Sequence, residues 1–369
     1  MATPAPRSRR PYIDWLRGVA VVIMILAHTM DSWTADGDRA TRGYSLVVKI
    51  SGMAAPLFLF LAGIAVALSA GAKARKTGDA AGAAAAVGRR GWQILALGLL
   101  FRLQSWVLGL LRAPASSMLK VDILNVMGLA MAGAAAVWGL STRPFARVAL
   151  LSGAAVIISL ATPPLRAAAW PAALPDALEW YLRPPPGRSW FALFPWAGLL
   201  FAGAAAGALV DRARDAAAER RVIMGLAVTG AVISGLSLGG SFLPSIYANS
   251  VFWTNSPSYF FLRIGLMTLL LTLAYVWCLR PTAHHWSPML VFGNSSLFVY
   301  WVHVELAYGG VSKPLRRALP FDRALAAFVV FTALMLVLTV VKTQVVSRWR
   351  ATRASSGTRV IEVAGSPQP

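Results

Sequence analysis

Residues 13–33 read IDWLRGVAVVIMILAHTMDSW, an apolar run long enough to cross a membrane but interrupted by ionisable side chains. On a helix, the eleven steps from Arg17 to His28 amount to about three turns, so both side chains lie on one face, roughly 16 Å apart along the axis. Asp14 and Asp31 fall within about 60° of this stripe. An ionisable side chain facing lipid costs on the order of 2–3 kcal/mol. The stripe is therefore predicted to face protein or water.

The composition of the whole chain is typical of a membrane protein. Of its 369 residues, 57% are hydrophobic and 13% charged, and the mean hydropathy is +0.62, whereas soluble domains carry about 25% charged residues. The net charge of +21 lies largely in short segments between apolar runs, which favours membrane topology over nucleic-acid binding. The single cysteine, Cys278, excludes an intrachain disulfide, and no paired-histidine metal signature occurs. Neither a metal nor nucleic acid is expected.

Ten apolar segments are candidate membrane spans, because about 20 residues cross the hydrocarbon layer. They predict an all-α polytopic membrane protein, a bundle of about 10 transmembrane helices. Lysine and arginine in the connections place both termini in the cytoplasm. The predicted parts are a basic cytoplasmic N-terminus (1–12), an integral membrane domain (13–346) and a disordered cytoplasmic tail (347–369). The segments are residues 13–33, 45–70, 91–111, 120–140, 145–163, 190–210, 222–243, 258–279, 288–308 and 323–346.

With this topology, polar side chains from six spans are predicted to share one layer, the outer half of the membrane. A common depth predicts a water-accessible cavity there. For each residue taken alone, a structural ion pair, a snorkelling side chain or a packed histidine stays open as the alternative. The groups are His28, Lys49, Arg102, Asp122, Asn125, Arg263, His303 and Glu305.

His28 is predicted to be the reacting group of this cavity. Imidazole takes up and returns a proton near neutral pH. Asp31, one turn away, or Glu305 across the cavity would orient its other ring nitrogen. The sequence contains no Gly-x-Ser-x-Gly elbow, Walker loop or Rossmann fingerprint, so the templates of common soluble enzymes are absent.

Five motifs follow one another along the chain: IDWLRG from residue 13 with His28 after it, APLFLFLAG at 55–63, DILNVMG at 122–128, FPW at 194–196 and GNSSLFVYWVH at 293–303. Together they resemble the bacterial relatives of heparan-alpha-glucosaminide N-acetyltransferase, its catalytic-domain family in the transmembrane acyltransferase superfamily. The likeness covers about residues 9–310. More loosely, the arrangement from Arg17 to His28 is similar to the membrane O-acetyltransferases of bacterial surface glycans.

This sequence departs from the family at one point. The lysosomal enzyme of the family has asparagine at the end of the first span and its catalytic histidine slightly later. Here His28 occupies the asparagine-like position, and no histidine lies between Asp31 and Lys49. The resemblance therefore supports acyl transfer more firmly than heparan chemistry.

The resemblance implies a multi-pass acyltransferase of the bacterial inner membrane. It would take an acyl group, commonly acetyl, from cytoplasmic acyl-CoA and deliver it to a sugar on the far side, with His28 as general base or acyl carrier. Basic side chains would hold the phosphates of the donor, and Arg102, Asn125 or Arg263 would stabilise the developing oxyanion. The implied catalytic set is His28, Asp31, Arg102, Asp122, Asn125, Arg263, His303 and Glu305, and the implied cofactor-binding set is Asp14, Arg17, Arg89 and Arg90.

Two alternatives stay open. Charges within spans and broken helices also occur in transporters or flippases for lipid-linked or small anionic substrates, although the sequence shows no two-fold internal repeat. Arg17 could equally be a positive-inside anchor paired with Asp14. The expected partners are acyl-CoA, a carbohydrate acceptor and the lipid bilayer. The sequence leaves open the acceptor, the acyl chain, N- or O-acylation, a homo-oligomer and a covalent acyl-histidine.

Overall fold

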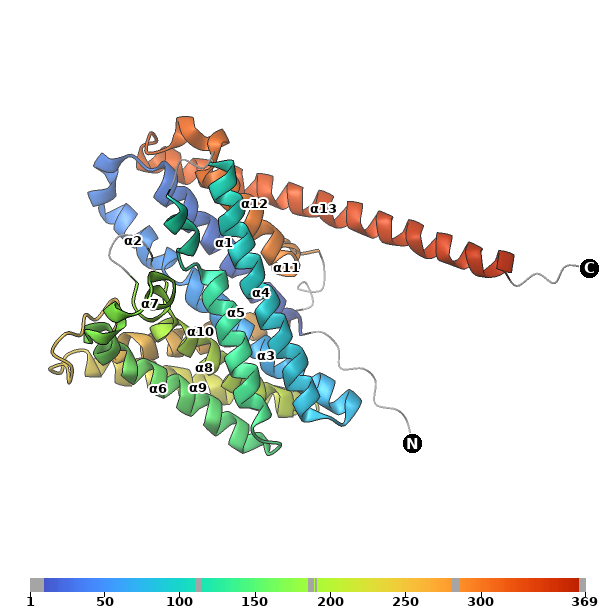
Figure 1. Cartoon of the computed structure of the whole chain (residues 1–369), viewed down its shortest axis with the longest axis horizontal. Coiled ribbons are helices and arrows are strands. Elements are labelled where there is room, and N and C mark those ends of the chain that lie inside the picture. Colours follow the sequence, from blue (N-terminus) through green and yellow to red (C-terminus); the bar gives the residue numbers. More distant parts are fainter. Residues whose placement is uncertain (1–9, 110–113, 185–188, 190, 281–285, 365–369) are drawn as a thin grey trace, which may run out of the picture. The chain divides into compact units, whose positions relative to one another are not determined.

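The computed structural model describes residues 10–109, 114–184, 189, 191–280 and 286–364, and Figure 1 follows the chain through them from blue to red. Within these ranges every regular element is a helix, which confirms the predicted all-α class. The α-helices are α1 (Pro11–Trp33), α2 (Arg42–Ser51), α3 (Ala54–Thr77), α4 (Ala80–Leu108), α5 (Ile123–Gly139), α6 (Pro144–Ala167), α7 (Asp176–Leu182), α8 (Leu193–Arg212), α9 (Ala216–Gly240), α10 (Pro257–Cys278), α11 (Pro288–Asn294), α12 (Ser296–Tyr308) and α13 (Phe321–Ala364). Short 3-10 helices are η1 (Asp36–Ala40), η2 (Ala115–Leu119), η3 (Trp170–Ala173) and η5 (Gly310–Leu315).

Among the described residues, seven helical segments are long and apolar enough to cross a membrane by length and composition. They are α1, α2 together with α3, α6, α8, α9, α10 and α13 as far as Arg350; α5 is apolar but shorter. Each of the ten predicted segments overlaps a helix. The chain is therefore a polytopic membrane protein, while the count of about 10 spans and the side on which the termini lie stay predictions.

Large apolar side chains remain exposed along the outer helices, as a lipid environment requires. On α9, Val228, Val232 and Leu236 recur every four residues and are 66%, 53% and 71% exposed. Four-residue spacing places them on one helix face. In water such a stripe would need a partner, whereas lipid solvates it directly.

Two predicted spans are interrupted. The segment 45–70 is divided into α2 and α3 around Gly52, and the segment 288–308 into α11 and α12 at Ser295. Glycine is a poor helix former, and serine competes for backbone hydrogen bonds, so both breaks have a local cause. α13 runs from Phe321 to Ala364, and the disorder of residues 347–369 stays a prediction.

The chain divides into two compact units. The first comprises Met1–Leu16 and Gly52–His284, and the second Arg17–Ser51 and His285–Pro369. Residues of the predicted membrane domain 13–346 occur in both units, and its boundaries stay a prediction. The stripe from Arg17 to His28 belongs wholly to the second.

The first unit is held together by close helix pairs. α3 packs along α8, α4 along α5, and α9 against α10. At Gly63 a Cβ atom would collide with the backbone carbonyl of Leu200, and at Gly203 with that of Phe60, so α3 and α8 touch backbone to backbone. Small residues permit this approach in membrane proteins, where packing rather than water exclusion joins helices.

The second unit joins the end of α1 to the start of α13. Met30, Tyr44 and Ala324 form a buried cluster that ties α1, α2 and α13 together. The amide of Ala35 donates to the carbonyl of Leu319 at 2.8 Å, and the amide of Leu319 donates to Trp33 at 3.0 Å. These contacts fix the end of the stripe at which Asp31 lies.

Candidate functional site

Two histidines meet in the second unit. His28 of α1 and His303 of α12 place Nδ1 and Nε2, respectively, 2.7 Å apart. Their rings are nearly parallel, at 14° to each other, with centroids 5.0 Å apart. His303 is fully buried, whereas His28 is only half-buried. The two predicted site histidines are therefore brought together, and the one nearer the surface is His28.

A second contact of His303 shows which ring nitrogens of the pair carry protons. Its Nδ1 lies 2.6 Å from the carbonyl oxygen of Val299. A carbonyl oxygen only accepts, so Nδ1 of His303 carries a proton. In the neutral ring Nε2 is then an acceptor, and the hydrogen on the short contact belongs to Nδ1 of His28. The lone pair of a neutral His28 is consequently on Nε2.

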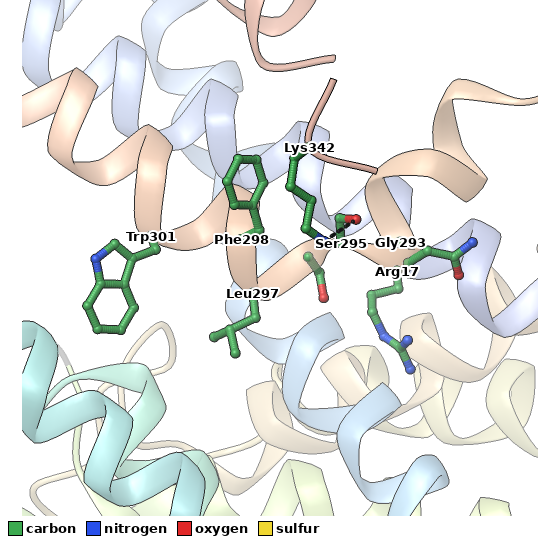
Figure 2. A pocket seen from close by; sticks show the side chains of 9 residues that line it. Arg17, Gly293, Ser295, Leu297, Phe298, Trp301 and Lys342 are labelled. Atoms are coloured by element: carbon green, nitrogen blue, oxygen red, sulfur yellow. Dashed lines mark hydrogen bonds between the residues drawn. The ribbon is translucent and has the colours of Figure 1, made fainter. Parts of the chain in front are cut away.

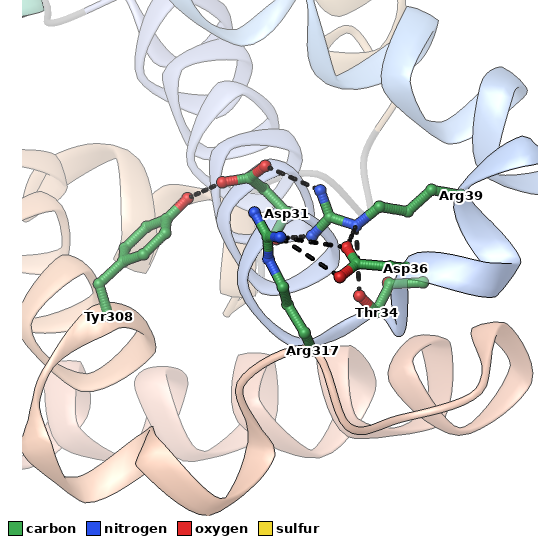
Figure 3. Close-up of polar contacts among 6 residues, drawn as sticks. All are labelled: Asp31, Thr34, Asp36, Arg39, Tyr308 and Arg317. Atoms are coloured by element: carbon green, nitrogen blue, oxygen red, sulfur yellow. Dashed lines mark hydrogen bonds and ion pairs between the residues drawn. The ribbon is translucent and has the colours of Figure 1, made fainter. Parts of the chain in front are cut away.

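Asp31, near the end of α1, is in contact with Tyr308 of α12, which also contacts His28; Figure 3 shows the first of these contacts. The Tyr308 hydroxyl donates to Asp31 Oδ2 at 2.8 Å, and its ring lies edge-on to His28 with centroids 5.6 Å apart. Arg39 donates to the backbone carbonyl of Asp31 and lies 3.8 Å from its carboxylate. The sequence predicts that Asp31 or Glu305 orients His28, whereas the structure places His303 at Nδ1.

Further ion pairs between acidic and basic side chains lie in the loops next to Asp31. Arg39 pairs with Asp36 at 3.4 Å, and Arg317 reaches the same carboxylate at 3.3 Å (Figure 3). Arg317 adopts a positive φ of 52°, an uncommon backbone conformation for a residue with a side chain. Its amide donates to the carbonyl of Ser32 at 2.9 Å. The contacts tie the loop before α13 to the end of α1.

A cavity of about 490 Å³ lies at the other end of the stripe (Figure 2). Two cations line it, Arg17 of α1 and Lys342 of α13. The Lys342 ammonium donates to Ser295 Oγ at 3.3 Å and lies 5.5 Å from the centre of the Phe298 ring. The remaining lining residues come from the break between α11 and α12 and from the first turns of α12: Gly293, Asn294, Ser296, Leu297 and Trp301.

Sequence reasoning identified Arg17 but missed Lys342 and the helix break at Ser295 beside it. Lys342 is an ionisable residue inside the predicted span 323–346, which is itself a signal of function. Asn294 and Ser295 interrupt an apolar run, and such interruptions mark ion and substrate sites in membrane proteins. Both features are visible in the sequence. Only the tertiary structure brings Lys342 and Ser295 into one cavity with Arg17.

Three predicted site residues of the first unit have structural contacts. Asp122 caps the N-terminus of α5 together with Asn125, whose side chain accepts from the Asp122 amide at 3.2 Å. Asp122 also pairs with Arg102 at 2.9 Å. The Asn125 amide donates to the Tyr181 hydroxyl at 3.2 Å, and burial raises the pKa of Tyr181, an effect that this hydrogen bond opposes. Their catalytic roles stay predictions.

Arg263, also in the first unit, lies among aromatic rings. Its guanidinium donates to the Tyr259 hydroxyl at 3.1 Å and lies 4.1 Å from the Tyr259 ring centre. Trp196 of the FPW motif approaches the same guanidinium, with its ring centre 5.3 Å away. A guanidinium stacked on rings is stabilised by the negative ring face.

The other predicted donor-binding residues also lie in the first unit. Asp14 is buried on α1. Arg89 and Arg90 are exposed on α4, where Arg90 donates to Gln93 at 3.0 Å. Glu305 is half-buried on α12 in the second unit. Across the described part of the chain, no cluster of three or more His, Cys, Asp or Glu side chains has the arrangement of a metal site.

Comparison with known proteins gives one family. The family model described as heparan-alpha-glucosaminide N-acetyltransferase, catalytic, matches residues 9–239, more than half of the 369 residues. The match includes α1 with Arg17 and His28 and ends before α12 and α13. None of the curated proteins with which the chain was compared matches it.

Proposed function

Since the chain belongs to the heparan-alpha-glucosaminide N-acetyltransferase catalytic-domain family, which indicates a membrane acetyltransferase, we propose that it transfers an acetyl group from cytoplasmic acetyl-CoA to an extracytoplasmic sugar. His28 takes the proton of the acceptor or carries the acyl group. The membrane is the bacterial inner membrane.

The observation that carries this proposal is the pairing of a cationic cavity with a histidine pair along one helix. Arg17 lines the cavity with Lys342, and His28 lies eleven residues further along α1, on the same face. Donor phosphates suit the first end, because guanidinium and ammonium groups form charge-assisted hydrogen bonds with phosphate oxygens. The thioester of the donor would then lie at the second end of the stripe, beside His28.

The predicted topology agrees with this division. Arg17 and Ser295 begin outward-running segments, and Lys342 lies near the end of the last inward-running one. All three then fall on the cytoplasmic side, where acyl-CoA is found. His28 and His303 fall in the outer half, where an extracytoplasmic acceptor arrives. The arrangement supports transfer across the membrane rather than on one face of it.

A test requires purified protein in lipid nanodiscs and acetyl-CoA with a labelled acetyl group. We expect acetyl-CoA binding, and release of CoA that depends on an added amino sugar or hydroxyl-bearing sugar. His28→Ala should bind the donor normally but lose turnover by roughly 100- to 10,000-fold, the usual contribution of a general base. His284→Ala, at a position outside the described residues, is the matched control and should keep its activity.

The transporter reading has one observation in its favour, the broken helix at Ser295 beside two cations. The same preparation decides between the two. Protein that neither binds nor hydrolyses acetyl-CoA in any lipid, yet moves a labelled anionic substrate into vesicles, is a transporter.

A further inference from the structure

We infer that His303 is a positioning residue, which holds His28 in the tautomer with its proton on Nδ1 and so makes acetyl transfer direct, with Nε2 of His28 as the proton-accepting atom. The inference rests on the proposed function and specifies how its reacting end works. His303 comes from α12, beyond the region that the family model matches.

The first step is the orientation of His303 by its own helix. Val299 precedes it by four residues, so its carbonyl lies one turn below the His303 ring. The 2.6 Å contact to Nδ1 fixes both the ring plane and the tautomer. His303 is 0% exposed, and burying a charged imidazolium without a counter-charge is costly, which favours the neutral ring. Its Nε2 is therefore a fixed acceptor.

The second step is the effect of that acceptor on His28. At 2.7 Å, Nε2 of His303 takes the hydrogen bond of Nδ1–H of His28 and selects one of its two neutral tautomers. The rings are nearly parallel, at 14° to each other, so the N–H bond of His28 points toward the lone pair of His303. Nε2 of His28, on the other side of the ring, is then the atom with the lone pair.

The third step is the reaction that this tautomer permits. The N–H or O–H proton of the acceptor moves to Nε2 of His28 while the acceptor atom bonds to the acetyl carbonyl carbon. The carbon–sulfur bond then breaks, and the CoA sulfur leaves with the electron pair and receives the proton from Nε2. His28 is returned unchanged. While it is an imidazolium, its Nδ1–H still donates to His303.

A covalent acyl-histidine fits this geometry less well. A neutral acetyl-imidazole formed at Nε2 must lose the proton on Nδ1. The acceptor at 2.7 Å is Nε2 of His303, which would then become a cation with no exposed surface. Direct transfer avoids that buried charge.

The other titratable groups near His28 do not replace His303. The Tyr308 hydroxyl donates to Asp31, and Arg39 lies 3.8 Å from the same carboxylate, so that carboxylate is already paired. Glu305 lies on α12 two residues beyond His303 and projects at about 200° from it around the helix.

Two substitutions test the role of His303. The amide oxygen of His303→Gln can accept from Nδ1 of His28, whereas His303→Leu removes the acceptor and keeps an apolar volume. We expect kcat of the Leu variant to fall roughly 10- to 100-fold, as when a partner that orients a metal-binding histidine is removed. The Gln variant should recover most of the loss, and the KM for acetyl-CoA should stay the same in both.

The spectroscopic readout needs no turnover. In protein with ¹⁵N-labelled histidine, the His28 ring should show a protonated Nδ1 and an unprotonated Nε2. The Gln variant should keep this pattern, and the Leu variant should show both tautomers. Acetyl-CoA binding and thermal unfolding report whether each variant is folded.

Three results would overturn the inference: equal activity of the folded Leu and Gln variants, a proton on Nε2 of His28 in the native spectrum, or stoichiometric acetylation of His28 when labelled acetyl-CoA is mixed with the protein without acceptor. If native protein turns over no acceptor at all, the proposed function fails, while the spectrum still decides the tautomer.

Discussion

Lys342→Gln tests the assignment of the cavity to donor phosphates. The substitution removes the cation but keeps a side chain that can still bond to Ser295, which accepts from Lys342 at 3.3 Å. A hydrogen bond to a charged group contributes about 1.5–3 kcal/mol, and each 1.4 kcal/mol is about tenfold in an equilibrium constant. Lys342 is half-buried, so solvent screens it in part. We therefore expect KM for acetyl-CoA to rise roughly 10- to 100-fold.

The value of kcat should change little, because Lys342 acts at the end remote from His28. Ser295, its partner, precedes His303 by eight residues, or about 12 Å along α12 if the helical rise is continued. The assay is initial-rate kinetics in nanodiscs with acetyl-CoA varied at saturating acceptor. Raised ionic strength should narrow the difference between native protein and variant, since an ammonium–phosphate contact is screened by salt.

Arg348→Gln is the matched control. It removes one positive charge from the same helix, six residues further on and therefore about 240° around the axis. An unchanged KM in Lys342→Gln would refute the phosphate assignment. An equal rise in both variants would also refute it, because the effect would then come from net charge.

Arg17→Ala should likewise raise KM for acetyl-CoA in initial-rate kinetics. Because both cations would bind one ligand, the free-energy changes of Arg17→Ala and Lys342→Gln should not add in the double variant. Strict additivity would mean that the two cations bind different ligands. Gly63→Ala forces a Cβ into a backbone carbonyl of the facing helix and should lower stability by about 1–3 kcal/mol, seen as a lower unfolding temperature in detergent, and an unchanged temperature would contradict this packing. Asp122→Ala removes a helix cap that contributes about 1 kcal/mol and leaves Arg102 without its carboxylate partner. Thermal stability should therefore fall, while acetyl-CoA binding stays normal. Loss of binding at full stability would instead favour the predicted catalytic role.

Much of the fold follows from apolar run length, because every backbone group in lipid must be satisfied within its own helix. That rule locates the helices but not their breaks. Gly52 and Ser295 interrupt two runs that hydropathy reads as continuous. Such breaks depend on a few residues whose polar contacts form only in the folded chain.

The candidate site was predictable in part. The cost of ionisable groups in lipid singled out Arg17, His28 and His303 from sequence. Their contacts were not predictable, because His28 and His303 are 275 residues apart in the chain and only tertiary packing brings them to 2.7 Å. The same reasoning read Asp122 and Asn125 as cavity residues, whereas their Asp-x-x-Asn spacing before an apolar run is also a capping signal.

Two helices of the second unit carry both ends of the proposed site. On α1 the cavity residue Arg17 and the reacting His28 are eleven residues apart, about 16 Å, and on the α12 side Ser295 and His303 are eight residues apart, about 12 Å. In the proposed function, the phosphates anchor the donor at one end, and the fixed helical spacing presents its thioester at the other. Loss of one contact at the cavity leaves the rest of the anchor in place and should raise KM alone. A truncated donor without the nucleotide loses the whole anchor, so it should lose kcat as well as affinity.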